Sequence, residues 1–121
     1  MGTIFHITTR QDWDAGQAAG RYSPPSLETE GFIHCSTGTQ TIPTANSYYK
    51  STHGLVLLCI DENKTQATVK YEGPAEAQDE RTDELFPHLY GSLNLDAVTQ
   101  VVDFPTNPDG TFDAPEVLRQ S

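Results

Sequence analysis

Short apolar runs of strand length alternate with turn-rich segments along this 121-residue chain. The run at 55–60 is apolar throughout, which predicts a central strand buried on both faces. The segment at 66–72 alternates instead, and Ala67, Val69 and Tyr71 are predicted to point inward. Further strands are predicted at 3–8, 31–36, 85–90 and 98–104.

Two segments carry helix signals. Thr9 is a predicted N-cap for a helix that reaches about Ala19, where Gly20 ends it. A second helix is predicted within 39–50, beginning after the first residues of that segment. Pro43 is placed in its first turn, because the missing N–H of proline costs nothing there.

The order of these elements predicts one α+β domain over residues 1–121 with a mixed sheet. A chain of this length has room for a single hydrophobic core. That core is expected to span about 3–104 and to be followed by a turn-rich tail at 105–121. Loops are predicted at 22–30 and at the acidic segment 73–84, whose composition allows a mobile lid.

Three of the four histidines lie inside the apolar runs, where a sequence selected for stability alone would more often carry valine or isoleucine. In one predicted strand the two-residue period places His34 and Ser36 on the same face. A later strand repeats this pattern with His88 and Tyr90, and the first strand contains His6. Titratable and hydroxyl side chains that share sheet faces predict the lining of a site.

The composition limits the classes of partner. The formal net charge is −10 and the seven basic residues are scattered, which argues against nucleic-acid and anionic-membrane surfaces and leaves a single small nucleotide possible. Cys35 and Cys59 lie in apolar runs and are expected to be reduced, buried thiols. No leader segment or membrane-spanning apolar run is recognised, so we expect a cytoplasmic protein.

The residues alone leave three kinds of site open. His6, His34 and His88 could together bind zinc or iron, although no closely spaced histidine pair supports a metal motif. Ser36 could be a nucleophile with a histidine as its base, although it lies outside a Gly-x-Ser-x-Gly elbow. In a ribose pocket, Glu72 could stabilise the positive charge that develops when a glycosidic bond breaks. The alternative is that each histidine is a satisfied core residue and Glu72 a solvated strand end.

Three ordered motifs extend along nearly the whole chain: Ile4-Phe5-His6-Ile7 with Trp13 and Gly20-x-Tyr22, Glu30-Gly31-Phe32-Ile33-His34-Cys35-Ser36 with Gln40, and Phe86-Pro87-His88-Leu89-Tyr90-Gly91 with Leu93. In these motifs the sequence resembles a family of small, mostly bacterial proteins, domain of unknown function 952. The resemblance implies a compact relative of the ADP-ribosyltransferase fold. In those enzymes the cleft of a split, mixed sheet holds NAD.

The resemblance also implies roles for individual residues. His6 matches a first-strand histidine that contacts a ribose in several branches of the transferases. His34 and Ser36 match the strand on the nicotinamide side, and Glu72 matches the transferase glutamate by position only. His34, Ser36 and Glu72 are therefore the candidate catalytic residues.

We expect His88 and Tyr90 to line the same cleft and, with His6, to contact the ligand, although their motif has no counterpart in the active transferases. The leading hypothesis is that the cleft binds NAD, ADP-ribose or a related nucleotide. If the protein is an enzyme, it would transfer or hydrolyse at the ribose anomeric carbon, with NAD as substrate and no firmly implied cofactor. The rivals are a non-catalytic binding module on the same fold and a histidine-assisted or metal-dependent hydrolase of a small molecule.

Overall fold

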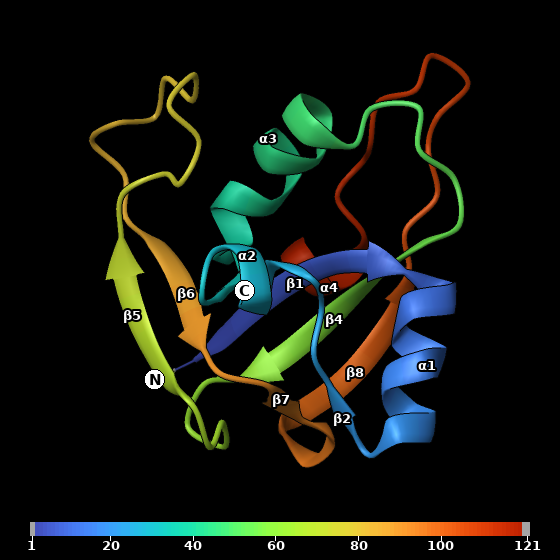
Figure 1. Cartoon of the computed structure of the whole chain (residues 1–121). Helices are drawn as coiled ribbons and strands as arrows, with labels where there is room; N and C mark the ends of the chain where they lie inside the picture. Colours follow the sequence, from blue (N-terminus) through green and yellow to red (C-terminus); the bar gives the residue numbers. More distant parts are fainter. Residues whose placement is uncertain (1, 120–121) are drawn as a thin grey trace.

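The strands of the computed structural model, which describes residues 2–119, form a split sheet (Figure 1). One half has the order β1-β4-β8 and the other has the order β3-β6-β5, while β2 and β7 pair in a small separate ladder. The bounds are β1 Thr3–Thr9, β2 Arg21–Tyr22, β3 Ile33–His34, β4 Leu55–Asp61, β5 Thr68–Glu72, β6 Phe86–Tyr90, β7 Leu93–Asn94 and β8 Val98–Asp103.

Every strand pair in the described part of the chain is antiparallel, so the expectation of a mixed sheet is wrong. Thr9 pairs with Leu55, which means that the chain re-enters the sheet at the end where β1 leaves it. A strand that re-enters at that end must run antiparallel to its neighbour.

In residues 2–119 a single isolated bridge joins the two halves of the sheet. Phe5 of β1 and Ser36, just after β3, exchange two backbone hydrogen bonds, each with an N···O distance of 2.8 Å. Beyond this bridge β1 and β3 diverge, and Figure 1 shows α3 above the opening between β1 and β6. Residues of α3 and of the loop between β5 and β6 lie on this side of the split.

The two longest helices are α1 (Arg10–Ala19) and α3 (Gly38–Tyr48). Thr9 caps α1 as predicted, since its Oγ1 accepts a hydrogen bond of 3.0 Å from the N–H of Asp12, and Gly20 ends the helix in the left-handed conformation. The shorter helices are α2 (Ser26–Thr29), the 3-10 turn η1 (Leu95–Ala97) and α4 (Glu116–Arg119).

Two helix predictions need correction. Pro43 lies inside α3 rather than in its first turn, because the helix begins earlier than predicted, at Gly38. Proline there leaves the carbonyl of Thr39 without its helical donor, and the exposure of Thr39 lets water supply one. The segment 22–30, predicted to be entirely loop, contains α2.

The central strand β4 is buried on both faces, as its apolar sequence predicted. Val56, Leu58 and Ile60 face a first core, shared with α1, β3 and β6. The alternate residues face a second core, which packs against α3 and the C-terminal tail: Leu55, Leu57 and Cys59.

The predicted limit of the core at about residue 104 is too early. Phe112 and Leu118 of the tail are buried in the second core together with Phe104. Tyr71 was predicted to point inward, yet it is 43% exposed, because β5 is an edge strand. Its hydroxyl donates a hydrogen bond to Glu62. Among the described residues, no helix is long and apolar enough to cross a membrane.

Candidate functional site

A cleft of about 270 Å³ lies where the sheet splits. Its walls come from β1, β3 and β6, from α3, and from the loop between β5 and β6. His34, Ser36 and His88 all line it, although His88 is more than fifty positions from the other two in the sequence. Tyr48, Tyr49 and Phe86 supply aromatic surface. With His6, which also lines the cleft, the structure brings four of the predicted site residues together.

His6 lies at the inner wall of the cleft and is buried. Its Nδ1 is 2.6 Å from the carbonyl oxygen of His34, and its Nε2 is 2.8 Å from the hydroxyl of Tyr22, which is also 2.9 Å from the hydroxyl of Thr8. Burial lowers the pKa of His6 to about 4, so the ring is neutral at pH 7. A neutral ring that donates from Nδ1 to a carbonyl must accept at Nε2, here from Tyr22. Both ring nitrogens are therefore occupied by the protein.

This arrangement decides against the three-imidazole metal site. His6 could act as a ligand only by giving up one of its two buried hydrogen bonds. No group of three or more histidine, cysteine, aspartate or glutamate side chains in residues 2–119 is arranged to hold a metal ion.

His34 lies at the rim of the cleft, with 41% of its side chain exposed. Its Nε2 is 2.8 Å from a carboxylate oxygen of Glu30, one turn earlier in the sequence. The ring packs against Phe32 and lies edge-on to His88, with ring centroids 5.9 Å apart. His34 and His88 are also direct partners across the β3–β6 ladder.

Ser36 is buried and is held in place by its backbone bonds to Phe5. Its hydroxyl lines the cleft but forms no hydrogen bond to a histidine within the described chain, so the geometry of a nucleophile and its base is not present. The neighbouring thiol of Cys35 belongs to the first core, where burial raises its pKa to about 12. The acyl-transfer alternative therefore lacks an activated nucleophile.

Glu72 and His88 form a carboxylate–imidazole pair. Oε1 of Glu72 is 2.8 Å from Nδ1 of His88 and 2.6 Å from the hydroxyl of Tyr90, which donates to it. These hydrogen bonds, first that of Tyr90, lower the pKa of Glu72, and the same contact raises the pKa of Tyr90. Glu72 and Tyr90 are not among the residues that line the cleft, so both are linked to it only through His88.

Phe32 packs against the His88 ring of this pair. Its ring stacks on His88 with centroids 4.1 Å apart and an interplanar angle of 16°. Only 5% of the His88 side chain is exposed. Phe32 lies two residues before His34, so the two-residue period places it on the same strand face, but its stacking on His88 was not predicted from the sequence.

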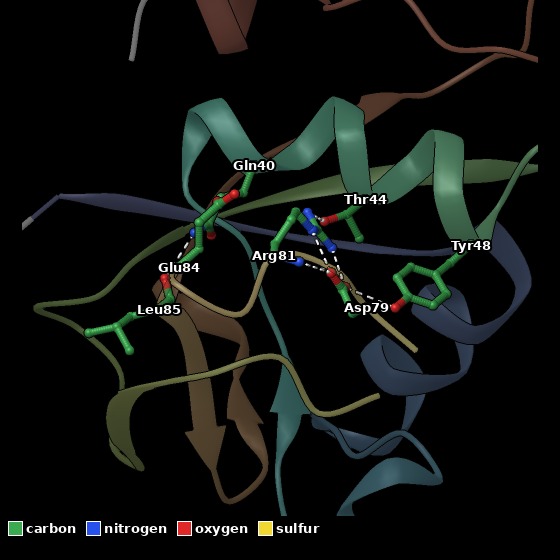
Figure 2. Close-up of polar contacts among 7 residues, drawn as sticks. All are labelled: Gln40, Thr44, Tyr48, Asp79, Arg81, Glu84 and Leu85. Atoms are coloured by element: carbon green, nitrogen blue, oxygen red, sulfur yellow. Dashed lines mark hydrogen bonds and ion pairs between the residues drawn. The ribbon is translucent and has the colours of Figure 1, made fainter. Parts of the chain in front are cut away.

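The loop between β5 and β6 is fastened to α3 by side chains that sequence analysis missed (Figure 2). The guanidinium of Arg81 donates two hydrogen bonds to the carboxylate of Asp79, at 3.0 and 2.7 Å, and a third to Thr44 of α3 at 2.9 Å. The hydroxyl of Tyr48 donates to Asp79 at 2.9 Å. Gln40 donates to the backbone carbonyl oxygen of Leu85 at 2.9 Å.

The spacing of the helix residues is the signal that could have revealed this contact. Gln40, Thr44 and Tyr48 recur every four residues, which places them on one face of a helix. The loop residues Pro74 and Ala75 line the cleft beside this contact. The loop is therefore one wall of the cleft, and its role as a lid stays a prediction.

At this wall the charge of Arg81 is cancelled by that of Asp79. The hydrogen bonds from Arg81 hold the pKa of Asp79 well below its usual range, and the carboxylate in turn raises the pKa of Arg81. The Arg81 guanidinium also lies over the ring of Phe86, 4.5 Å from its centroid. The single arginine of the cleft is thus neutralised, and Glu76 adds a carboxylate beside it.

Comparisons with known proteins agree on the family and the fold. The family profile described as "Protein of unknown function (DUF952)" matches residues 7–101. The chain is similar to the crystal structure of protein CC0527 from Caulobacter crescentus, with 30% identity, a TM-score of 0.83, and coverage of 97% of this chain and 98% of that chain. A solution NMR structure of CC0527 gives 31% identity and a TM-score of 0.80 over 100% of both chains. No curated protein matches the sequence.

Proposed function

The chain belongs to the DUF952 family, and within that family we propose that this protein binds a nucleotide related to NAD or ADP-ribose in the cleft of its split sheet. One observation carries the proposal: His34, Ser36 and His88 converge on the same cleft from β3 and β6. Imidazole nitrogens and a hydroxyl are suited to hydrogen bonds with ribose hydroxyls.

The shape and lining of the cleft narrow the part of the ligand that enters it. Ligand pockets commonly measure roughly 300–1,000 Å³, so a cleft of about 270 Å³ fits a ring and its sugar better than a whole dinucleotide. Tyr48, Tyr49 and Phe86 offer surfaces on which a base can stack. Because Arg81 is neutralised by Asp79, the phosphates belong outside, near the mouth.

The fold supports the same class of ligand by analogy. We propose that the split antiparallel sheet is a compact version of the ADP-ribosyltransferase fold, in which the equivalent cleft holds NAD. Fold analogy alone does not fix an activity. The convergence of polar side chains at the split is what favours this ligand class over others.

We propose that any reaction occurs at the ribose anomeric carbon, by transfer or hydrolysis. His34 and Ser36 orient the ring or its sugar from the rim and the floor of the cleft. His6 supports this floor through its bond to the carbonyl oxygen of His34 rather than touching the ligand. A non-catalytic binding module stays a second candidate, because Glu72 is hydrogen-bonded to His88 and Tyr90 instead of lining the cleft.

An NMR titration of the four histidine side chains with NAD and with ADP-ribose tests the proposal. We expect the signals of His34 and His88 to shift, and those of His53, whose Nδ1 lies 3.4 Å from the hydroxyl of Thr106 in another part of the molecule, to stay unchanged. His34→Ala should weaken binding, and His53→Ala is the matched control.

The outcomes separate the two candidates. Binding with release of nicotinamide supports the enzyme, whereas binding without release supports the binding module. No histidine shift at millimolar nucleotide would exclude the nucleotide class altogether.

A further inference from the structure

The ring of His88 is held by two contacts, and its backbone is fixed within the sheet. Phe32 stacks on one face, Glu72 contacts Nδ1, and the β6 backbone pairs with both β3 and β5. Lys70, the cross-strand partner of His88, carries its ammonium over the ring of Tyr90, 4.8 Å from the centroid. The ring of His88 therefore has little freedom to turn.

The hydrogen-bond pattern fixes where the proton of His88 lies. The bonds from Tyr90 and His88 keep the pKa of Glu72 below its ordinary value, so Glu72 is a carboxylate at neutral pH and can only accept. Nδ1 of His88 must then be the donor in the 2.8 Å contact. In the neutral ring this leaves Nε2 without a proton and with its lone pair free.

The lone pair of Nε2 reaches the cleft. Within residues 2–119, Nε2 of His88 has no hydrogen-bond partner, and no buried side-chain nitrogen or oxygen lacks one. Nε2 is therefore in contact with solvent, and the space that His88 lines is the cleft. A nitrogen that can accept a proton thus faces the position of a ligand.

We propose that Tyr90, Glu72 and His88 act as one cluster, in which His88 is the general base of the cleft and Glu72 is a positioning residue that acts only through His88. This inference rests on the proposed function for its substrate, but not for its geometry. It moves Glu72 away from direct contact with the developing positive charge, the role that its strand-end position had suggested. Tyr90 anchors Glu72 through its 2.6 Å hydrogen bond.

In the step assigned to His88, water is the acceptor of the ribosyl group. The water molecule gives a proton to Nε2, and its oxygen forms a bond to the anomeric carbon of the ribose. The carbon–nitrogen bond breaks, and its electron pair goes to the ring nitrogen of the leaving nicotinamide, which becomes neutral. The imidazolium is stabilised by the Glu72 carboxylate and later releases its proton to solvent.

The histidine tautomer can be measured on the intact protein without any ligand. Long-range ¹H–¹⁵N correlation spectra distinguish Nδ1–H from Nε2–H imidazoles. We expect His88 to be a single Nδ1–H tautomer in the native protein. Glu72→Gln should give a mixture, because an amide can present either an acceptor or a donor to Nδ1.

Matched variants control this measurement. Glu62→Gln removes a carboxylate that likewise accepts from a tyrosine hydroxyl, that of Tyr71, and should leave His88 unchanged. Tyr90→Phe keeps the Glu72–His88 contact and should keep the tautomer, and it serves if Glu72→Gln does not fold. An Nε2–H tautomer in the native protein, or no change in a folded Glu72→Gln, would overturn the inference.

Turnover of NAD supplies the second readout. His88→Ala should lower kcat roughly 100-fold or more, which is the usual contribution of a general base. Glu72→Gln should lower kcat while leaving KM for NAD nearly unchanged, and an effect on KM alone would contradict a positioning role. Absence of NAD cleavage with the expected tautomer pattern would overturn the proposed reaction while the positioning by Glu72 stands.

Discussion

At the scale of single residues, His6 and His88 show how packing assigns different roles to identical side chains in similar sequence contexts. His6 uses both ring nitrogens in buried contacts with the protein, to His34 and Tyr22. His88 uses only Nδ1 and leaves Nε2 toward the cleft. Neutral, saturated histidines support structure, whereas a histidine with one free nitrogen can act on a ligand.

The buried state of His6 predicts a specific pH dependence of stability. The unfolded chain takes up a proton at this ring near pH 6.5, but the folded chain does so only near pH 4. Stability should therefore fall as pH decreases through this window, by up to about 3 kcal/mol from this group. Urea unfolding between pH 7 and pH 4.5 measures the loss, and His6→Gln should show a shallower one. Equal slopes for the two proteins would contradict the assignment.

At the scale of elements, the contact between α3 and the β5–β6 loop holds one wall of the cleft in place. The stripe of Gln40, Thr44 and Tyr48 binds the second half of the loop, and the first half covers the cleft. The hydroxyl bonds of this stripe are partly exposed, so each contributes modestly. Local opening of the loop should therefore cost far less than unfolding of the domain.

Thiol labelling tests this opening. Ser36→Cys introduces a thiol at the floor of the cleft, while burial raises the pKa of Cys35 to about 12 and of Cys59 to about 11, so both native thiols react slowly. In this background, Thr44→Val with Tyr48→Phe removes two hydrogen bonds of about 1 kcal/mol each. The labelling rate at pH 8 should then rise roughly tenfold or more.

The control is Ser47→Ala, which removes an exposed hydroxyl from the same helix. Its labelling rate should equal that of Ser36→Cys alone. A rate that rises equally in both variants would show that the helix, not the contact with the loop, governs access.

At the scale of the whole molecule, β4 separates two cores, and the C-terminal tail completes the second. Phe112 stacks on Phe104 with ring centroids 4.7 Å apart. Gly110 allows the tail to approach the α3–β4 loop, because it adopts a left-handed φ of 88° and a Cβ there would lie 2.2 Å from Oγ of Ser51. The tail is therefore part of the folded unit.

Phe112→Ala should destabilise the domain by about 3–5 kcal/mol, the range for removing a buried phenylalanine. Phe112 is only 3% exposed, so the substitution leaves a cavity in the second core. Chemical denaturation measures the change, with Leu85→Ala as the control, since Leu85 is 58% exposed and should matter little. A loss below about 1 kcal/mol would mean that the tail is only loosely attached.

The sequence by itself determined several of the main elements and drew attention to the histidines that line the cleft. Apolar periodicity, the Thr9 cap and Gly20 predicted β1, α1 and β4 correctly, because these signals act within one turn or one strand. The uninterrupted run at 55–60 also predicted a strand buried on both faces. The three histidines in apolar runs all line one cleft, although their roles in a site stay predictions.

Only the tertiary structure decided how those residues are used. Which nitrogen of His6 or His88 is occupied depends on partners 16 to 28 positions away, which no local pattern encodes. The antiparallel arrangement of the split sheet and the contact between α3 and the β5–β6 loop also arise from packing between distant segments. Short-range propensities specify what each segment can form, but hydrogen bonding and burial between segments select the site.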